Sequence, residues 1–450
     1  MLGEMGWMST YIVDALMIGR LPHSALSISA SSLGNTIFYA IAFCAIGLLT
    51  GLQTLTAQAY GRGNEQDGAL TVAQACLMVA VLTPLVMLAT LASIPLLSVF
   101  KTPPDIIAET SRYLHALVWS TAPLLLYWGL RKYLQSVDRV ILITVSLVSS
   151  SFVNFVADWA FLYGHLGLPK FGIAGSGWAT VVVRFFALAL LLVALGRYFR
   201  ISAIRFSRSL LRPNWDRLRV LLHLGWPPAL ESLADLSVST FTSILCAQLG
   251  ATLLAAHQVV LDLNAFVYMV PLGLSYATTA RVGQGAGRNS VRQARRSAQA
   301  SLMLGLGLIA IAAPLFAGLP RFWAGLYTND AAVVTAAAPI FLLCGILQFG
   351  DAAGAILAAA LVGVGDTRTP LIVNTIWSWV LGMPLSYWLT FDNGLGLKGL
   401  WIGRVLASIG ASITLALIWQ QRIRSMNLSN PSSGRGTYSF GIQPPLAEPG

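Results

Sequence analysis

The chain has 450 residues, of which 56% are hydrophobic and only 10% are charged, and its formal net charge is +11. Since about 25% of the residues of a soluble domain are charged, this composition excludes an ordinary soluble protein and indicates an all-α polytopic membrane protein. The net positive charge does not require nucleic acid as a partner, because membrane topology accounts for it.

Apolar runs separated by turn signals predict about 12 transmembrane helices. The predicted spans are 1–18, 33–57, 68–99, 113–136, 140–163, 174–196, 220–247, 253–279, 298–319, 333–362, 370–390 and 399–420. The first span has no basic leader, so we expect no cleaved signal peptide. It is short, so either its helix begins at the membrane edge or the true start of the chain lies upstream.

Basic residues are distributed unevenly between the two sides of the predicted membrane. The connections on one side, together with the C-terminal tail, hold 20 lysines and arginines, and the connections on the other side hold 6. The positive-inside rule then places the richer side and both termini in the cytoplasm. We therefore predict a multi-pass protein of the cell (inner) membrane.

The second half of the sequence repeats the first. Gly172 and Gly175 recur as Gly396 and Gly399, at an offset of 224, and two further strings recur at 223 and 225. Six spans per repeat is an even number, so the two halves have the same orientation and form two pseudo-symmetric six-helix lobes. The predicted parts are an N-terminal lobe (1–196), a basic cytoplasmic linker (197–219), a C-terminal lobe (220–420) and a disordered tail (421–450).

Seven of the 17 acidic residues lie within predicted spans. They are Glu4, Asp14, Asp158, Glu231, Asp235, Asp262 and Asp351. A carboxylate in hydrocarbon costs at least about 2.5 kcal/mol, so such residues usually face a protein interior or a water-filled cavity. There they bind ions, protons or cationic ligands.

The first half holds two of these candidate sites. Asp14 has apolar neighbours on both sides, which favours a cavity-facing group over a boundary residue that snorkels. Asn154 and Asp158 are four residues apart and share a helix face. An amide beside a carboxylate suits a hard cation such as sodium, but a hydrogen bond between helices explains this pair equally well.

The second half holds a similar pair. Glu231 and Asp235 are four residues apart, and because like charges repel, we expect at least one of them to hold a proton at rest. A shared, movable proton suits a transporter. Asp351 lies among small residues that allow helices to approach closely. Asp262 either joins these acids or pairs with a polar neighbour such as His257.

Two arginines, Arg184 and Arg404, lie within spans 6 and 12 and could neutralise some of the acids. The string Gly363-Val364-Gly365-Asp366 matches the Gly-x-Gly-Asp of intramembrane aspartyl proteases, but it falls at a helix end, where glycine commonly terminates helices. The sequence contains no Walker A or HExxH motif. We expect no enzyme activity, no cofactor and no ATP-driven transport.

Several strings occur in a characteristic order and spacing. They are Val13 to Arg20, Ala57 to Gly63, Asn154 to Asp158 with Tyr163-Gly164, Leu168 to Gly175, Leu224 to Pro227, Ala255 to Val259, and Asp351 with Gly365-Asp366. Together they resemble the multidrug and toxic compound extrusion (MATE) family in its bacterial NorM and DinF branches. The resemblance implies a secondary antiporter with two lobes that exports organic cations or other amphiphiles against an inflow of protons or sodium.

The resemblance also assigns residues by position. Asp14, Asp235 and Asp351 match the family's acids of helices 1, 7 and 10, associated with the NorM branch, whereas Asn154 and Asp158 match the helix-5 pair of the DinF branch. Both sets occur in this chain, so the branch and the coupling ion stay open, with sodium as one possible ligand of Asp14, Asn154 and Asp158. Glu231 and Asp262 are additional acids.

The implied partners are a small cationic or amphiphilic substrate and membrane lipids, without nucleic acid, for a protein expected to be a monomer. The alternative function is that of a flippase for lipid-linked oligosaccharides. That function would require arginines to hold a pyrophosphate, and only Arg184 and Arg404 lie within the spans.

Overall fold

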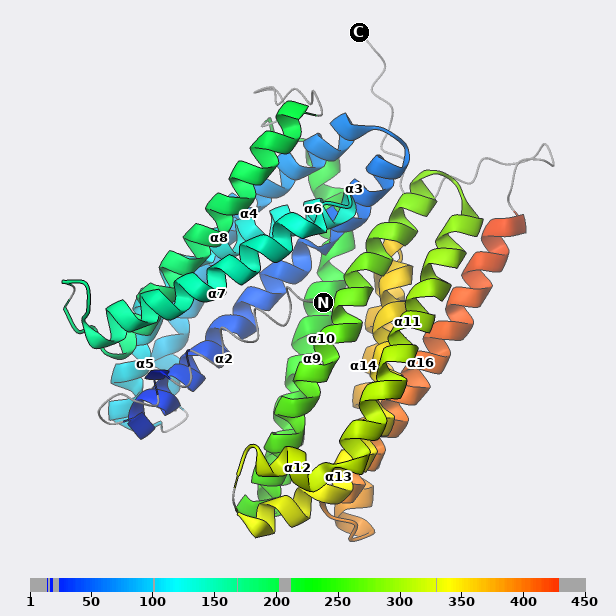
Figure 1. Cartoon of the computed structure of the whole chain (residues 1–450). Helices are drawn as coiled ribbons and strands as arrows, with labels where there is room; N and C mark the ends of the chain where they lie inside the picture. Colours follow the sequence, from blue (N-terminus) through cyan, green and yellow to red (C-terminus); the bar gives the residue numbers. More distant parts are fainter. Residues whose placement is uncertain are drawn as a thin grey trace. The chain divides into compact units, whose positions relative to one another are not determined.

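The computed structural model describes residues 14, 17–18, 24–99, 102–167, 169–201, 212–328 and 330–428. Within these ranges every regular element is a helix (Figure 1). In the same part of the chain, eight helices are long and apolar enough to cross a membrane. These findings confirm the predicted all-helical membrane class. Glu4 and most of the first predicted span lie outside the described residues.

The described residues form two compact units. One comprises residues up to Ala59 and Gly63–Ala229, and the other comprises Tyr60–Arg62 and residues from Leu230 onward. The boundary therefore falls inside a single helix, α9 (Trp215–Gln248), directly after Pro227 and Pro228. Each proline lacks a backbone N–H, which weakens the helix at this point.

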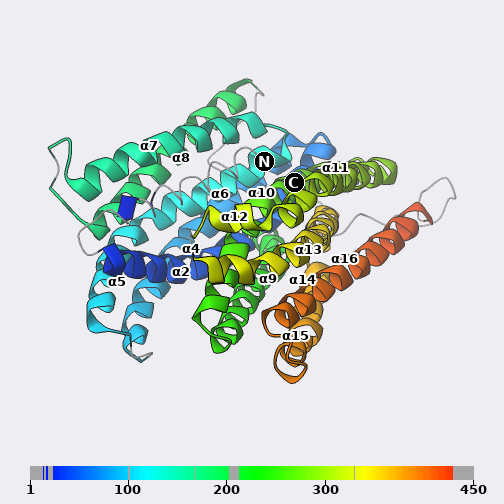
Figure 2. The same cartoon turned by 60° about the horizontal axis from the view of Figure 1, so that its bottom comes forward.

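The first unit contains helices α2 to α8 and the first half of α9. Their bounds are α2 (Ser24–Leu48), α3 (Thr50–Gly61, whose last two residues belong to the second unit), α4 (Glu65–Val99), α5 (Pro104–Leu117), the 3₁₀ turn η1 (Val118–Ser120), α6 (Thr121–Ser136), α7 (Val140–Tyr163) and α8 (Ile173–Ile201). Helices α7 and α8 lie side by side (Figures 1 and 2). The first half of α9 packs tightly on α2, since a Cβ on Gly225 would lie 2.0 Å from the carbonyl oxygen of Leu48.

The second unit contains the rest of α9 and a further set of helices. They are α10 (Ala251–Gly287), α11 (Val291–Gly318), α12 (Pro320–Gly325), α13 (Ala331–Gly363), α14 (Arg368–Thr375), the π-helix η3 (Ile376–Gly382), α15 (Met383–Tyr387), the π-helix η4 (Trp388–Asp392) and α16 (Leu397–Leu428). Helix α16 continues through residues 421–428, which we assigned to the tail, because Ile423 packs with Leu415 and Trp419 in a buried apolar cluster. Residues 429–450 lie outside the described part.

The glycine repeat corresponds to a repeated turn. Gly172 and Gly396 have φ angles of 58° and 55°, which favour glycine, and each precedes a long helix, α8 or α16. Gly175 donates its N–H to Gly172 O at 2.9 Å, and Gly399 donates to Gly396 O at 3.0 Å. The same local structure thus occurs at the offset of 224 found in the sequence.

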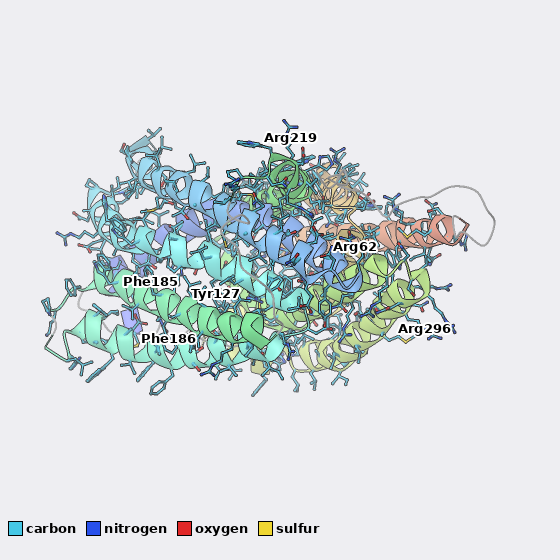
Figure 3. All side chains as sticks on the ribbon, turned by 90° about the horizontal axis from the view of Figure 1, so that it is seen from above. Arg62, Tyr127, Phe185, Phe186, Arg219 and Arg296 are labelled. Atoms are coloured by element: carbon cyan, nitrogen blue, oxygen red, sulfur yellow. The ribbon has the colours of Figure 1, made fainter. Side chains whose placement is uncertain are left out.

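Two basic residues that we counted as loop charges are buried inside α6. Lys132 donates from Nζ to the Oγ1 of Thr50 at 3.2 Å, and the Arg131 guanidinium lies 4.5 Å from the ring centroid of Trp128. By contrast, Arg219 and Arg296 are exposed near the first turns of α9 and α11 (Figure 3). Without these two residues, the predicted cytoplasmic side holds 18 lysines and arginines and the opposite side holds 6.

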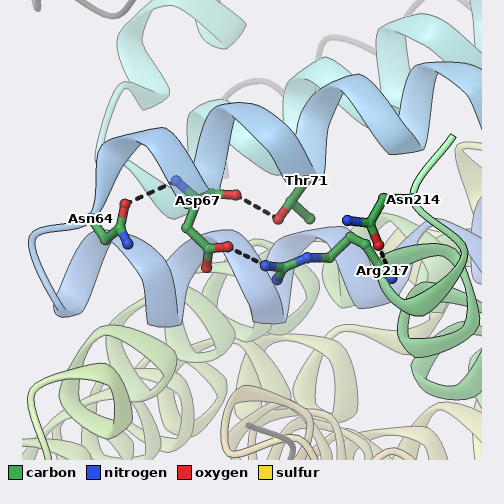
Figure 4. A network of polar contacts seen from close by, with 5 residues as sticks. All are labelled: Asn64, Asp67, Thr71, Asn214 and Arg217. Atoms are coloured by element: carbon green, nitrogen blue, oxygen red, sulfur yellow. Dashed lines mark hydrogen bonds and ion pairs between the residues drawn. The ribbon is translucent and has the colours of Figure 1, made fainter. Parts of the chain in front are cut away.

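The end of the predicted linker is attached to the start of α4 (Figure 4). Arg217 pairs with the carboxylate of Asp67, whose backbone N–H donates to Asn64 Oδ1 at 3.0 Å. The N–H of Arg217 donates to Asn214 Oδ1 at 3.0 Å, and Gln74 Oε1 accepts the N–H of Asn214 at 2.9 Å. Only residues 202–211 of the linker lie outside the described ranges.

Candidate functional site

Asp14, Asn154 and Asp158, which we call the first acid cluster, come together in the first unit. Asn154 and Asp158 lie one turn apart on α7 and are 1% and 0% exposed. Asp14 is helical and half-buried, and its carboxyl lies within interaction range of both the Asp158 carboxyl and the Asn154 amide. The structure thus joins two candidates that are 140 residues apart in the sequence.

The oxygens of the first acid cluster have few hydrogen-bond donors. Both Oδ atoms of Asp158, and Oδ1 of Asp14 and of Asn154, are buried and make no well-formed hydrogen bond with any described residue. An unpaired buried carboxylate is costly, and it becomes favourable when it binds a proton or a cation. Oxygen ligands of this kind suit a proton or a hard cation such as sodium.

Arg184 lies within electrostatic range of Asp14 but is held by other residues. Its guanidinium donates to the Oγ of Ser120 and, at 3.0 Å, to the hydroxyl of Tyr39. The ring centroid of Phe38 lies 5.0 Å from its Cζ. Arg184 therefore moderates the negative charge of the cluster from a fixed position. Ser120 and Tyr39 were not predicted, because uncharged residues of these types carry no distinctive sequence signal.

Glu231, Asp235 and Asp351, which we call the second acid cluster, come together in the second unit. Glu231 and Asp235 lie one turn apart on α9 and interact electrostatically. Asp235 also interacts with Asp351 on α13. Asp235 is exposed, whereas Glu231 and Asp351 are half-buried. Three of the four acids singled out from the second half of the sequence are therefore neighbours.

Each half-buried acid of the second cluster has a hydrogen-bond donor. Asn374 donates from Nδ2 to Glu231 Oε1 at 2.6 Å, and Ser408 donates from Oγ to Asp351 Oδ1 at 2.6 Å. Neither donor was predicted from the sequence. Asn374 lies in the last turn of α14, next to the π-helix η3, and Ser408 lies on α16, so both reach the acids through helix packing alone.

The π-helix η3 helps to explain how this part of the chain reaches α9. A π-helix closes its hydrogen bonds five residues apart, so residues at i and i+5 lie near one face. Asn374 and Trp379 have this spacing, and Trp379 Nε1 lies 3.4 Å from the carbonyl oxygen of Ala234. Asn374 contacts Glu231 and Trp379 contacts Ala234, so the two contacts lie about one turn apart on α9. Segments of π-helix occur frequently at functional sites.

The remaining candidates lie in different places. Asp262 is not brought into the second acid cluster, since its two oxygens accept from Gln258 Nε2 at 2.8 Å and from the Tyr327 hydroxyl at 3.4 Å. Arg404 on α16 interacts electrostatically with Asp235 and Asp351 and therefore lies beside the second acid cluster. His257 is fully buried and accepts a hydrogen bond from Trp401.

Asp366 of the protease-like string lies at the start of α14. Its carboxylate accepts from the backbone N–H of Thr369 at 3.1 Å and from the Thr369 hydroxyl at 2.9 Å, and it pairs with Arg422 at 3.3 Å. These are the contacts of a residue that stabilises a helix start, which agrees with our interpretation of the string as a helix boundary.

Comparison with known proteins gives matches along most of the chain. A family model described as MatE matches residues 1–160 and 227–388. A probable multidrug resistance protein NorM of Rhizobium meliloti (strain 1021) is 32% identical over 416 residues, covering 90% of this chain and 87% of the relative. The multidrug resistance protein PmpM of Pseudomonas aeruginosa is 31% identical over 430 residues, covering 93% and 88%.

Solved structures match the fold. The crystal structure of MATE in complex with MaD3S superposes with a TM-score of 0.87 at 18% identity, covering 95% of both chains. An outward-facing multidrug resistance MATE family transporter of the MOP superfamily gives a TM-score of 0.86 at 18% identity, covering 95% of this chain and 94% of the other. The two-lobe helical fold of those proteins is therefore also the fold of this chain.

Proposed function

The chain belongs to the MatE family of membrane transporters, and on that premise we propose that it is a secondary antiporter that exports organic cations or other amphiphiles in exchange for H⁺ or Na⁺. The observation that carries the proposal is the first acid cluster, where four buried oxygens have no hydrogen-bond partner among the described residues. A proton or a sodium ion would satisfy these oxygens, and it enters here as a transported ion rather than as a resident cofactor.

The two acid clusters give the exchange a physical basis. Asp14, Asn154 and Asp158 bind the coupling ion, and Glu231, Asp235 and Asp351 supply negative charge for a cationic substrate and for further protons. Neutralising carboxylates weakens their attraction for a cation, so ion entry and substrate release are coupled. Each ligand lowers the affinity for the other by the same factor at equilibrium.

We place the protein in the cell membrane as a monomer with both termini in the cytoplasm. Exposed apolar side chains on long helices support contact with lipid, for example Phe152 on α7 at 72% and Met303 on α11 at 75%. The charge asymmetry of 18 to 6 supports the orientation.

The test is ethidium export from proteoliposomes that contain the purified full chain, under a proton gradient and a sodium gradient imposed separately. The variants are Asp14→Asn, Asp158→Asn, Asp235→Asn and Asp351→Asn, with Asp262→Asn as the control because its carboxylate lies outside both clusters. We expect the four variants to lose ion-driven export and the control to keep it. Unchanged export in all four would overturn the proposal.

The flippase alternative has less support. It would require arginines placed to hold a pyrophosphate, but Arg184 and Arg404 each lie within electrostatic range of carboxylates, which repel phosphate. Transfer of a fluorescent lipid-linked oligosaccharide across the proteoliposome membrane, without ion-driven ethidium export, would favour the alternative.

A further inference from the structure

Arg404 has an incomplete set of hydrogen bonds and two acidic neighbours. Its Nη1 is buried and has no hydrogen-bond partner in the described part of the chain. Arg404 lies one turn before Ser408 on α16, whose hydroxyl donates to Asp351 at 2.6 Å, and its charge lies within electrostatic range of Asp235 and of Asp351. An arginine side chain stays protonated in proteins, so this positive charge is permanent. The second acid cluster therefore contains its own cation.

A buried aromatic pair lies next to Arg404. Its Cζ lies 5.7 Å from the ring centroid of Trp401, within the range of a cation–π interaction. Trp401 is fully buried and donates from Nε1 to His257 Nδ1 at 3.1 Å. His257 is also fully buried, so this hydrogen bond fixes the position of the Trp401 ring. The ring in turn limits the directions in which Arg404 can move.

The other intramembrane arginine shows what is unusual about Arg404. Arg184 donates from both Nη atoms, to Ser120 and to Tyr39, so its guanidinium is held by neutral residues. The Nη1 of Arg404, by contrast, is buried and has no acceptor among the described residues. A donor of this kind gains a hydrogen bond whenever a nearby carboxylate becomes available. Arg404 is therefore suited to pair with its acids and to release them again.

We propose that Arg404 is a built-in counter-cation that competes with the exported cation for Asp235 and Asp351, and that Trp401, supported by His257, is the residue that positions it. The inference rests on the proposed function, because it requires these two acids to bind the exported cation. In the empty site Arg404 balances the two carboxylates. An organic cation has to bind against the repulsion of Arg404, and the same repulsion favours release of that cation.

The first experiment measures equilibrium binding of ethidium to the purified full chain in lipid nanodiscs, at constant pH and without sodium. Arg404→Gln removes the competing charge, so we expect the Kd for ethidium to fall about fivefold or more, the lower end of typical coupling between sites. Arg404→Lys keeps the charge and should leave the Kd within about twofold of the unaltered protein, a change of less than 0.5 kcal/mol.

The matched control is Arg422→Gln. It changes the net charge equally and lies on the same helix, but Arg422 pairs with Asp366 rather than with the second acid cluster. We expect no change in its Kd. A fall in Kd as large as that of Arg404→Gln would show a general effect of net charge and would overturn the proposal.

The positioning role of Trp401 has its own readout. Trp401→Leu removes the ring beneath Arg404 and should lower the Kd in the same direction as Arg404→Gln. The double variant should bind no more tightly than Arg404→Gln alone, because both changes remove one competitor. Trp401→Phe keeps a ring and should have a smaller effect than Trp401→Leu. Additive effects in the double variant would overturn the assignment of Trp401.

The outcomes separate this inference from the proposed function. If Asp235→Asn and Asp351→Asn leave ethidium binding unchanged, the proposed substrate site is wrong. If these variants weaken binding but Arg404→Gln leaves the Kd unchanged or raises it, only the counter-cation proposal is wrong. Should Arg404→Gln fail to yield folded protein, Trp401→Leu decides, since an unchanged or higher Kd in that variant contradicts the proposal.

Discussion

Four buried oxygens of the first acid cluster have no hydrogen-bond partner among the described residues, whereas each half-buried acid of the second acid cluster has a side-chain donor. The arginines differ in the opposite sense. Arg184, beside the first cluster, donates to Ser120 and Tyr39, but the buried Nη1 of Arg404, beside the second, has no acceptor in the part of the chain that the structure describes. Similar residue types thus occupy two different electrostatic settings.

This difference agrees with the two proposed roles, ion coupling at the first cluster and substrate binding at the second. Unpaired oxygens gain most from binding a proton or a small cation, so the first cluster suits ion coupling. Carboxylates that are already hydrogen-bonded and partly balanced by an arginine bind a cation less tightly, so the second cluster suits a substrate that has to be released. The glycine turns before α8 and α16 have the same local structure, while the side chains of the two clusters differ in their partners.

The largest expected effect comes from removing the charge of the first cluster. Asp158→Asn should reduce ion-driven ethidium export by about 100-fold, because losing a buried charged group costs roughly 2–5 kcal/mol and 1.4 kcal/mol is a factor of ten. Initial rates in proteoliposomes measure this effect. Export above about one tenth of the normal rate, a loss of less than 1.4 kcal/mol, would mean that the first cluster is not the main coupling site.

The shared scaffold can be tested by stability. A Cβ on Gly175 would lie 2.5 Å from Phe161 O, and one on Gly399 would lie 2.6 Å from Leu389 O. Gly175→Ala and Gly399→Ala should therefore destabilise the protein similarly, by about 1–3 kcal/mol, seen as a lower Tm in detergent. Gly196→Ala and Gly307→Ala are controls, since outside the local helix backbone no atom of the described residues lies within 4 Å of their added Cβ. A loss for only one of the two repeat glycines would break the equivalence of the turns.

The donors of the second cluster should have a smaller effect. Asn374→Leu and Ser408→Ala each remove a hydrogen bond to a carboxylate, which is worth about 1.5–3 kcal/mol when the carboxylate is charged. We expect the KM for ethidium export to change by about tenfold in each variant, a change of about 1.4 kcal/mol. Thr414→Ala, also on α16, is the control for Ser408→Ala because its hydroxyl contacts Trp377 rather than an acid. Equal effects of Ser408→Ala and Thr414→Ala would rule out a specific role for Ser408.

The smallest effect is expected for Asp262→Asn. This acid lies in a predicted span, but both of its oxygens accept from neighbouring side chains and it is not part of either cluster. Its loss should change the export rate by less than about twofold, as for substitutions away from structural or functional features. A loss comparable with that of Asp351→Asn would place Asp262 in the transport site and would require a wider second cluster.

The sequence by itself determined the helical membrane class, the repeat at an offset of 224 and the family resemblance. It also singled out the acids that form both clusters. These features follow from composition, local spacing and the high cost of a charge in hydrocarbon, each of which can be evaluated without knowing which helices touch. The distinctive Gly172 and Gly396 turns were visible for the same reason, since a positive φ favours glycine locally.

Only the tertiary structure decided the partners of those acids. Asn374 contacts Glu231 across 143 residues, and Trp401 contacts His257 across 144. Three further features were also not predictable from the sequence. They are the burial of Lys132 inside α6, the contact of Trp379 with α9, and the separation of Asp262 from the second acid cluster. Such contacts depend on the packing of distant helices, and the packing is set by many weak contacts together rather than by any local pattern.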